Sequence, residues 1–409
     1  MTKEVCNFCG NGLENVFVDL GLSPLANSYT NPAEANKGEM FFPLRTYVCG
    51  KCFLVQAPQC ELPENIFSDY HYFSSYSKSW VEHAKQYAHK MVDELKLSPD
   101  SLVVEIASND GYLLQHFKEK GIKITGVEPA KNIAKIANEK GINTICEFFG
   151  EDFAKASNIK ADLVAANNVL AHVPDINSFV KGFKVILKEN ATLTVEFPSV
   201  LNLIKYNQFD TIYHEHFSYL SLSVVSRIFS AHGLKVYNVE KLPTHGGSLR
   251  VYACHKECNR EICEAVSLLL DEEKNFGLAD LKIYDDFKNK VLASKRNILK
   301  WLFELKEQGK KIIGYGAAAK GNTLINYCGI REDIINYVVD ANPHKQNKYL
   351  PGSRIPIYSG DKIKETKPDY IIILPWNLKD EISKQLNYIN DWGGKFITLI
   401  PEVSIFDVH

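Results

Sequence analysis

The sequence has no apolar run long enough to cross a membrane and no marked excess of charge of either sign. No stretch approaches the roughly 20 apolar residues of a membrane-spanning helix, and Met1-Thr2-Lys3-Glu4 lacks the apolar core of a secretory signal. The 409 residues carry a formal net charge of −2, which disfavours nucleic acid as an electrostatic partner. We therefore expect a cytoplasmic protein of two or three domains that binds neither membranes nor nucleic acids.

Nothing in the sequence indicates secretion, so disulfide bonds are not expected among its ten cysteines. Four of them form two Cys-x-x-Cys pairs, Cys6 with Cys9 and Cys49 with Cys52. Such pairs supply four soft ligands for tetrahedral Zn²⁺, and a redox-active pair is the alternative. Because protein ligands would fill all four positions, the zinc is expected to be structural. The long interval between the pairs predicts an irregular insert near residues 31–40.

A glycine-rich dinucleotide motif is also missing. A strand-like run ending in Glu105 leads into a turn in which Ala107 and Asn109 replace glycines of Gly-x-Gly-x-x-Gly, and only Gly111 remains. Glu105 would repel a pyrophosphate but could receive an ammonium group. S-adenosylmethionine (SAM) has that group and no phosphate, so we favour a SAM site in which Glu128 accepts hydrogen bonds from the ribose. A buried turn without ligand is the alternative.

Strand-like and helical patterns alternate through the middle of the chain. Strands are expected at residues 102–106, 122–127, 143–148, 162–167 and 191–196, and helices at 79–95, 113–120 and 133–140. Such alternation predicts a mostly parallel sheet covered on both faces, with ligands at the carboxyl ends of the strands. The cofactor-binding candidates at those ends are Glu105, Ala107, Asn109, Asp110, Gly111, Glu128, Pro129, Phe148 and Asn167.

The last third of the sequence predicts a long helix followed by a second α/β unit. The helix is expected to bury an apolar stripe made of Tyr284, Phe287, Val291, Ile298, Leu302 and Leu305. The glycine turn at residues 314–321 is not a P-loop, because Asn322 stands where the lysine should be. Gly314, Gly316 and Lys320 could still cradle a phosphate of a nucleotide-linked substrate, and a structural tight turn is the alternative.

Polar and aromatic side chains gather at Tyr213-His214-Glu215-His216 and are costly to bury without partners. The two histidines lie two positions apart, so this is not a His-Glu-x-x-His metalloprotease helix. If the segment is extended, Tyr213 and Glu215 share one face and the histidines the other. One histidine could then act as a base, and a solvated polar turn is the alternative. The tyrosine-rich segment 70–76 is either core or a lid over a site.

These motifs together resemble the SAM-dependent sugar C-methyltransferases of deoxysugar biosynthesis. The resemblance rests on the two Cys-x-x-Cys pairs and on residues 105–111, 167–172, 213–216, 245–248 and 314–322. It covers essentially the whole chain and implies an α/β protein of three parts. These are an N-terminal zinc-binding module at residues 1–70, a central Rossmann-like SAM methyltransferase domain at 71–275, and a connecting helix with a C-terminal Rossmann-like α/β domain at 276–409.

The resemblance implies C-methylation of a dTDP- or GDP-linked 4-keto-6-deoxyhexose, usually at C-3. A carbon next to a carbonyl becomes nucleophilic once its proton is removed, so the site needs a base and a group that stabilises the enolate. The carbanion would then attack the SAM methyl group in line. By resemblance His216 is the base, and Glu215 and Tyr213 orient it or the substrate. The resemblance also places His172 near the carbonyl oxygen and gives as substrate-binding candidates Tyr76, Asn168, His214, His245, Lys320 and Asn322.

Two other functions remain open at this stage. One is an O- or N-methyltransferase on the same sugars, which would need no enolate. The other is a non-catalytic, zinc-containing sugar-nucleotide binding protein. We expect a monomer, because three domains can enclose the site without a partner.

Overall fold

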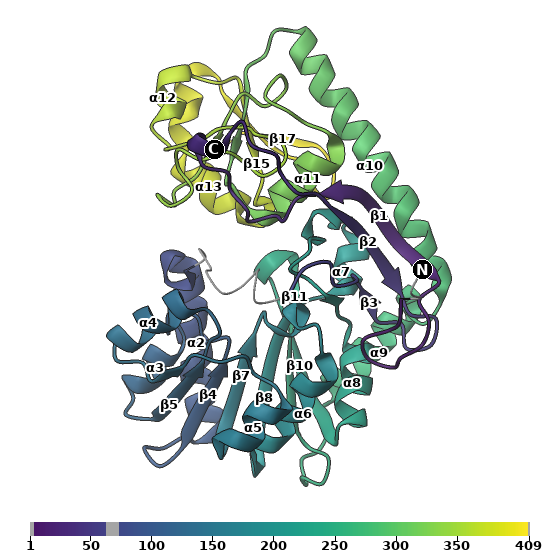
Figure 1. Ribbon diagram of the computed structural model, residues 1–409, viewed down its shortest axis with the longest axis vertical. Coiled ribbons are helices and arrows are strands. Elements are labelled where there is room, and N and C mark those ends of the chain that lie inside the picture. Colours follow the sequence, from purple (N-terminus) through teal and green to yellow (C-terminus); the bar gives the residue numbers. More distant parts are fainter. Residues whose placement is uncertain (1–3, 63–72, 408–409) are drawn as a thin grey trace.

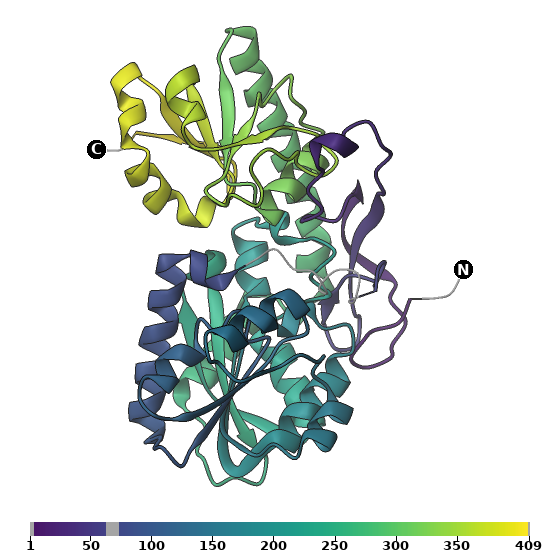
Figure 2. The same cartoon turned by 60° about the vertical axis from the view of Figure 1, so that its left-hand side comes forward.

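The computed structural model describes residues 4–62 and 73–407, which form two α/β lobes and a smaller N-terminal module beside them. Figure 1 shows the central lobe below and the C-terminal lobe above, with the long helix α10 (Leu281–Glu307) running along one side between them. The N-terminal strands lie against this helix, and Figure 2 shows them at the side of both lobes. The expected α/β fold is thereby confirmed, although the expected boundary at residue 70 lies outside the described residues.

The N-terminal module is built around a small antiparallel sheet. Strands β1 (Asn15–Ser23), β2 (Phe42–Val48) and β3 (Val55–Gln56) come from the module itself, and β9 (Ser218–Tyr219) completes the sheet from the middle of the chain. The expected insert is present, with only the short turn η1 (Pro32–Glu34) inside it. It docks on the C-terminal lobe, where Glu39 accepts a hydrogen bond from Gly352 N (2.8 Å) and pairs with Arg354 (3.1 Å).

The central lobe is a seven-stranded sheet in the order β10-β11-β8-β7-β4-β5-β6, in which only β11 runs antiparallel to its neighbours. Its strands are β4 (Leu102–Ile106), β5 (Lys123–Val127), β6 (Thr144–Ile145), β7 (Ala161–Asn167), β8 (Leu187–Pro198), β10 (Leu234–Leu242) and β11 (Ser248–His255). The strand expected at 143–148 is shorter than predicted. It is an edge strand that pairs only with β5, and β5 ends at Val127.

Helices cover both faces of this sheet, as the alternating pattern predicts. One face carries α2 (Lys78–Leu95), α3 (Leu114–Lys118) and α4 (Lys131–Glu139), which share a buried cluster with Val103. The other carries α5 (Glu151–Ser157), α6 (Ile176–Ile186), α8 (Leu222–Ala231) and α9 (Glu264–Phe276). Short turns stand at the carboxyl ends of strands, among them η3 (Leu170–His172), η4 (Phe209–Thr211) after α7 (Val200–Lys205), and η5 (Thr244–Gly246).

The C-terminal lobe is a six-stranded sheet in the order β14-β13-β12-β15-β16-β17, parallel except for β17. Its elements are β12 (Ile312–Tyr315), α11 (Ala319–Cys328), β13 (Val338–Val339), β14 (Ile357–Tyr358), α12 (Lys362–Thr366), β15 (Tyr370–Ile373), η6 (Trp376–Leu378), α13 (Lys379–Gln385), η7 (Asn387–Trp392), β16 (Lys395–Thr398) and β17 (Ser404–Phe406). The apolar stripe predicted on the connecting helix is confirmed, because all six of its residues are buried in α10.

No helix in residues 4–62 or 73–407 is long and apolar enough to cross a bilayer.

Candidate active site

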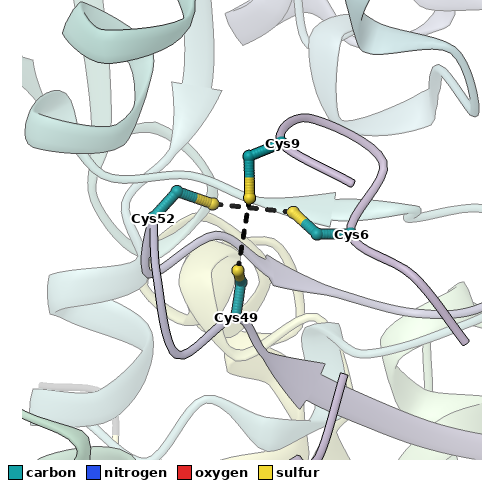
Figure 3. A group of neighbouring side chains, drawn as sticks. All are labelled: Cys6, Cys9, Cys49 and Cys52. Carbon is teal, nitrogen blue, oxygen red and sulfur yellow. Dashed lines mark hydrogen bonds between the residues drawn. The ribbon is translucent and has the colours of Figure 1, made fainter. Parts of the chain in front are cut away.

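The four cysteines of the two Cys-x-x-Cys pairs meet in one cluster (Figure 3). Their sulfur atoms all lie within 4.8 Å of one another, with Cys6 Sγ to Cys52 Sγ at 3.5 Å and Cys9 Sγ to Cys49 Sγ at 3.6 Å. Tetrahedral zinc with Zn–S bonds of about 2.3 Å requires sulfurs about 3.8 Å apart, so the cluster fits this ion. Gln56 Nε2 contacts Cys6 Sγ at 3.2 Å and orients that ligand from outside the cluster. All four coordination positions are filled, which makes the site structural.

The backbone of the turn after β4 has a conformation that allows a ligand to approach closely. Ala107, Asn109 and Gly111 have positive φ angles of 56°, 48° and 81°, and a Cβ at Gly111 would lie 2.7 Å from Ile142. Only glycine therefore fits at position 111 without displacing the β5–β6 connection. The other two residues adopt a conformation that is uncommon outside glycine and typical of functional turns.

Two buried carboxylates flank this turn. Glu128, which directly follows β5, accepts hydrogen bonds from Asn109 N (3.0 Å) and Ala130 N (2.9 Å) and so holds the turn in place. Glu105 is 1% exposed, and its oxygens accept no hydrogen bond of normal geometry from the described residues. Burial raises the pKa of Glu105 well above its usual range, although the Tyr112 hydroxyl acts in the opposite direction. A cationic group bound here would compensate for that desolvation.

The remaining cofactor candidates lie around the same edge of the sheet. Asp110 is 1% exposed and contacts Lys140 Nζ at 2.9 Å and the Ser75 hydroxyl. Pro129 follows Glu128 directly, whereas Phe148 is 41% exposed. Asn167 ends β7, and its buried Oδ1 has no partner within the described part of the chain.

The segment around Tyr213 is a tight turn, which corrects the extended conformation considered from sequence. His216 N donates to Tyr213 O at 2.9 Å, and this bond brings the first and last rings of the turn together, with centroids 4.1 Å apart. The residues that follow the turn are fixed, because Phe217 N donates to Ala171 O (2.8 Å) and β9 pairs with β3. The turn therefore sits between η3 and the N-terminal module.

The hydrogen bonding of His216 assigns its proton. Its Nδ1 lies 2.9 Å from Thr211 O, and a carbonyl oxygen only accepts, so Nδ1 carries the hydrogen. In the neutral ring, Nε2 then holds the lone pair. Burial and the neighbouring His172 hold the pKa of His216 well below 6.5, so the ring is neutral at physiological pH. A neutral, fixed imidazole of this kind can accept a proton.

Two further histidines lie close to His216. The His172 ring centroid is 4.6 Å away, and burial lowers the pKa of His172 to about 4. His245, in a left-handed conformation with φ 53°, packs against Trp80 at 5.3 Å. Burial, with the Lys320 ammonium, lowers the pKa of His245 to about 4. Both rings are therefore neutral, and the single N–H of His172 donates to the backbone oxygen of Glu215.

The two central residues of the turn point toward the N-terminal module. His214 Nε2 lies 3.3 Å from Pro43 O, and its ring packs on Phe42 with centroids 5.9 Å apart. Glu215 is 3% exposed and accepts a hydrogen bond from Asn27 Nδ2 at 2.6 Å. Since Thr211 O occupies Nδ1 of His216, the structure gives Glu215 no contact with that ring nitrogen.

The remaining substrate candidates lie in different surroundings. Asn168 has φ 53°, and neither its buried Oδ1 nor its Nδ2 has a partner in the described residues, as expected for a ligand-binding amide. Lys320 Nζ donates to Asn377 Oδ1 (2.8 Å) and lies over Trp376. Asn322 is 1% exposed and donates to Ala26 O (2.6 Å), so its Nδ2 ties two modules together. Tyr76 is 58% exposed, and residues 70–72 of its tyrosine-rich segment lie outside the described residues.

The glycine turn of the C-terminal lobe matches the structural alternative. A Cβ at Gly316, where φ is 86°, would lie 2.5 Å from Pro375. The Ala317 amide, which would be a phosphate donor, already donates to Asp340 Oδ2 at 2.7 Å. This amide is therefore already engaged, and the close approach of Pro375 accounts for glycine at position 316.

Several residues of the site were not predicted from sequence. Trp376 Nε1 donates to Asp210 Oδ2 at 2.7 Å, and burial raises the pKa of Asp210 to about 6. Glu196, at the end of β8, is fully buried between His83 (3.1 Å) and Arg250 (2.7 Å). Although burial raises the pKa of Glu196, these two partners hold it below its usual value. Asp210 falls in the polar segment before Tyr213, but the others carry no local motif.

A curated relative decides the family. The chain is 36% identical to the C-methyltransferase NovU of Streptomyces niveus over 410 aligned positions, which cover 99% of this chain and 97% of the relative. This protein is a C-methyltransferase of that family. A shorter match, 28% identical over 136 residues, joins 32% of the chain to 39% of the sterol 4-C-methyltransferase strm-1 of Caenorhabditis elegans.

Family models divide this C-methyltransferase in the same order as its folded parts. A zinc-binding domain matches residues 6–67, a methyltransferase domain matches residues 80–239, and a C-methyltransferase C-terminal domain matches residues 243–401. Among solved structures, the magnesium protoporphyrin IX methyltransferase of Synechocystis PCC 6803 is 15% identical, with a TM-score of 0.35 over 43% of this chain and 83% of the other. A SAM-dependent methyltransferase of Clostridium acetobutylicum is 12% identical, with a TM-score of 0.36 over 43% and 92%.

The C-methyltransferase therefore uses SAM as its methyl donor and has a structural zinc site at Cys6, Cys9, Cys49 and Cys52. When bound, SAM supplies an electrophilic methyl group, and the buried turn after β4 is the part of this chain that fits it.

Proposed function

We propose that this C-methyltransferase acts on a nucleotide-linked 4-keto-6-deoxy sugar and methylates it at C-3 through an enolate. The observation that carries this proposal is the state of His216. Its ring is neutral, Nδ1 is tied to Thr211 O at 2.9 Å, and Nε2 holds the lone pair. Transfer of a methyl group to carbon requires a carbanion, and a positioned neutral base next to a carbonyl generates one.

The enolate needs a hydrogen-bond donor that is not consumed by the reaction. We place His172 at the carbonyl oxygen, because its ring lies beside His216 and its pKa of about 4 keeps the imidazole neutral; its single N–H, which donates to the Glu215 backbone oxygen, would be shared with the sugar oxygen. A donor already oriented in a buried site stabilises a developing oxyanion more strongly than water does. The partnerless amide of Asn168 supports a second contact to the sugar from the adjacent loop.

We assign the cofactor by the same chemistry. Glu105 receives the ammonium group of SAM, and Glu128 binds the ribose hydroxyls with the lone pairs that Asn109 N and Ala130 N leave open. Asp110, Pro129, Phe148 and Asn167 complete this pocket. The dTDP or GDP part of the substrate then extends toward Lys320, between the two lobes, and His245 faces the sugar.

The test is mass spectrometry of dTDP- and GDP-linked 4-keto-6-deoxy sugars incubated with the zinc-loaded enzyme and SAM in deuterated buffer. We expect one methyl group to replace a carbon-bound hydrogen, and deuterium to enter the same position when SAM is omitted. Methylation at oxygen or nitrogen, without exchange at carbon, would contradict the enolate. The full-length enzyme is expected to elute as a monomer in size-exclusion chromatography with light scattering.

A further inference from the structure

A short segment of the N-terminal module reaches the catalytic turn from a distant part of the sequence. Asn27, four residues after β1, donates a hydrogen bond from Nδ2 to Glu215 Oε1 at 2.6 Å. Glu215 is 3% exposed, so a lost partner could not be replaced freely by water. A short bond from an amide donor to a buried carboxylate belongs to the stronger class of protein hydrogen bonds.

The segment that carries Asn27 is fixed to the C-terminal lobe. Asn322 Nδ2 donates to Ala26 O at 2.6 Å, and the Tyr29 hydroxyl donates to Ala317 O at 2.5 Å. The backbones of Thr30 and Tyr349 exchange two hydrogen bonds, at 3.1 and 2.9 Å. Asn27 is therefore presented to Glu215 from a segment that is held on both sides, and its amide has a fixed direction.

We propose that Asn27 is a positioning residue of the C-methylation reaction, which fixes the orientation of the Glu215 carboxylate beside His216. This inference rests on the function proposed above, in which the turn from Tyr213 to His216 acts on the sugar. Glu215 immediately precedes His216 in a tight turn, so fixing the carboxylate also limits the movement of the ring. The N-terminal module thus contributes directly to the geometry of the active site.

Attachment of the module does not depend on the Asn27 amide. The β3–β9 pairing, the contact of Asn322 with Ala26 and that of Tyr29 with Ala317 all remain when the Asn27 side chain changes. A variant at position 27 can therefore be folded and zinc-loaded and still have a misdirected Glu215. This separates a positioning role from a role in stability.

The decisive variant is Asn27→Asp, which keeps the shape of the side chain and makes its donor depend on protonation. At lower pH the new carboxyl group is protonated and can donate to Glu215. At higher pH two carboxylates face each other, and one of them must turn away or take up a proton. Activity should therefore be near that of the wild type at the acidic end of the range and fall as pH rises, giving a descending limb that the wild type lacks.

Neighbouring groups do not produce such a limb between about pH 6 and 8. Burial raises the pKa of Tyr29, which keeps its hydroxyl neutral, and lowers the pKa values of the surrounding histidines, whose loss of a proton with rising pH would give an ascending limb and not a descending one. Asp340 and Lys345 lie 3.8 Å apart and compensate each other's charge. The Tyr29 hydroxyl lies 3.4 Å from Asn27 Oδ1 and interacts with Lys345 and Asp340, while His172 donates to the Glu215 backbone and His214 and His216 flank Glu215 in the sequence.

The experiment measures kcat and KM as a function of pH, with one of the dTDP- or GDP-linked 4-keto-6-deoxy sugars that the wild-type enzyme methylates. Asn27→Ala should lower kcat on the order of 10-fold to 100-fold at every pH, because the orienting donor is lost, with the affinity for SAM unchanged in calorimetry. Asn27→Asp should recover most of this loss at the acidic end only. Asn138→Asp is the matched control, since its amide donates to Ala134 O and Thr144 O away from the site, and it should keep the wild-type profile.

Each outcome decides between the proposals. If the wild type methylates one of the nucleotide-linked 4-keto-6-deoxy sugars and Asn27→Asp shows the wild-type kcat and pH profile, the role of Asn27 is refuted and the proposed function stands. The same holds if Asn138→Asp acquires an equal descending limb, because the effect would then be general. If the wild type methylates none of the sugars, the proposed function fails and the role of Asn27 in it falls with it.

Discussion

The sharpest test of the catalytic assignment is His216→Asn. The asparagine amide can replace Nδ1–H as the donor to Thr211 O, now 2.9 Å from the ring nitrogen, but it has nothing in place of the Nε2 lone pair. The substitution thus removes the proposed base and preserves the hydrogen bond to Thr211 O. Stability should fall only by about 1 kcal/mol, as for a typical substitution that keeps its hydrogen bond.

The expected loss of activity is much larger. A positioned general base contributes a factor of about 10² to 10⁴, which corresponds to about 3 to 5 kcal/mol of activation free energy. Methyl transfer and deuterium uptake at the sugar carbon should fall by the same factor, because both need the same deprotonation. Both are measured by mass spectrometry of one reaction mixture, with and without SAM.

His214→Asn is the matched comparison, because that ring lies two positions away and faces Pro43 O at 3.3 Å. Its kcat should fall far less than that of His216→Asn. The reasoning is refuted if His216→Asn keeps methyl transfer within about tenfold of the wild type. It is also refuted if methyl transfer is lost while deuterium uptake persists, since another group would then be the base.

The wild-type pH profile gives an independent check. Burial and the nearby His172 hold the pKa of His216 well below 6.5, and the base is active when neutral. The rate should therefore stay level as pH falls through 6.5 and decline only at lower pH. A half-maximal rate near 6.5 would show that His216 titrates as an exposed histidine and is not buried as described.

Three further predictions concern the cofactor, the metal and a buried ion pair. Burial raises the pKa of Glu105, and the SAM ammonium favours the ionised carboxylate, so the affinity for SAM should strengthen as pH rises through that pKa. Glu105→Gln should weaken SAM binding about 10-fold to 100-fold and abolish this pH dependence. Both effects are measured by calorimetry. Cys49→Ser should lose zinc in elemental analysis and lower the melting temperature, because site formation and folding are coupled. Arg250→Met removes the guanidinium partner of the buried Glu196 and leaves it the His83 ring at 3.1 Å, which should cost about 3 to 5 kcal/mol in denaturant unfolding, and adding Glu196→Gln should recover part of it.

The opposite result in any of these three experiments would refute the assignment that it tests. A pH-independent SAM affinity would remove Glu105 from the ammonium site. Zinc retained by Cys49→Ser in full amount would mean that the cluster is not a four-cysteine site. No recovery on adding Glu196→Gln would show that Arg250 stabilises the lobe by packing alone.

Local pattern in the sequence was a good guide wherever one element or one motif carries the information. The apolar stripe of α10 repeats at helical spacing, and all six of its predicted residues are buried. The strand expected at 102–106 is β4, because a continuous apolar run is what a central parallel strand requires. The four cysteines were recognisable from spacing, since a metal ion demands that number and type of ligand.

Prediction from sequence was weaker for segments whose conformation depends on contacts with residues elsewhere in the chain. The edge strand β6 is shorter than its apolar pattern, because β5 offers it no backbone beyond Val127. The segment from Tyr213 to His216, for which an extended conformation was considered, forms a turn closed by the bond from His216 N to Tyr213 O, and the residues after it contact Ala171 and β3. Ala171 and β3 lie elsewhere in the sequence, so no pattern within residues 213–216 reveals these contacts.

The sequence by itself determined the zinc ligands, the alternation that makes the central sheet, the position of the tight turn after β4 and the presence of a histidine-rich polar segment. Only the tertiary structure decided which nitrogen of His216 carries the hydrogen, which residue contacts the Glu215 carboxylate, and how Trp376 reaches Asp210. The reason is distance along the chain. Asn27 and Glu215 are 188 positions apart, and Asp210 and Trp376 are 166 apart, so these bonds exist only after three modules have packed together and fixed each side chain from elsewhere in the molecule.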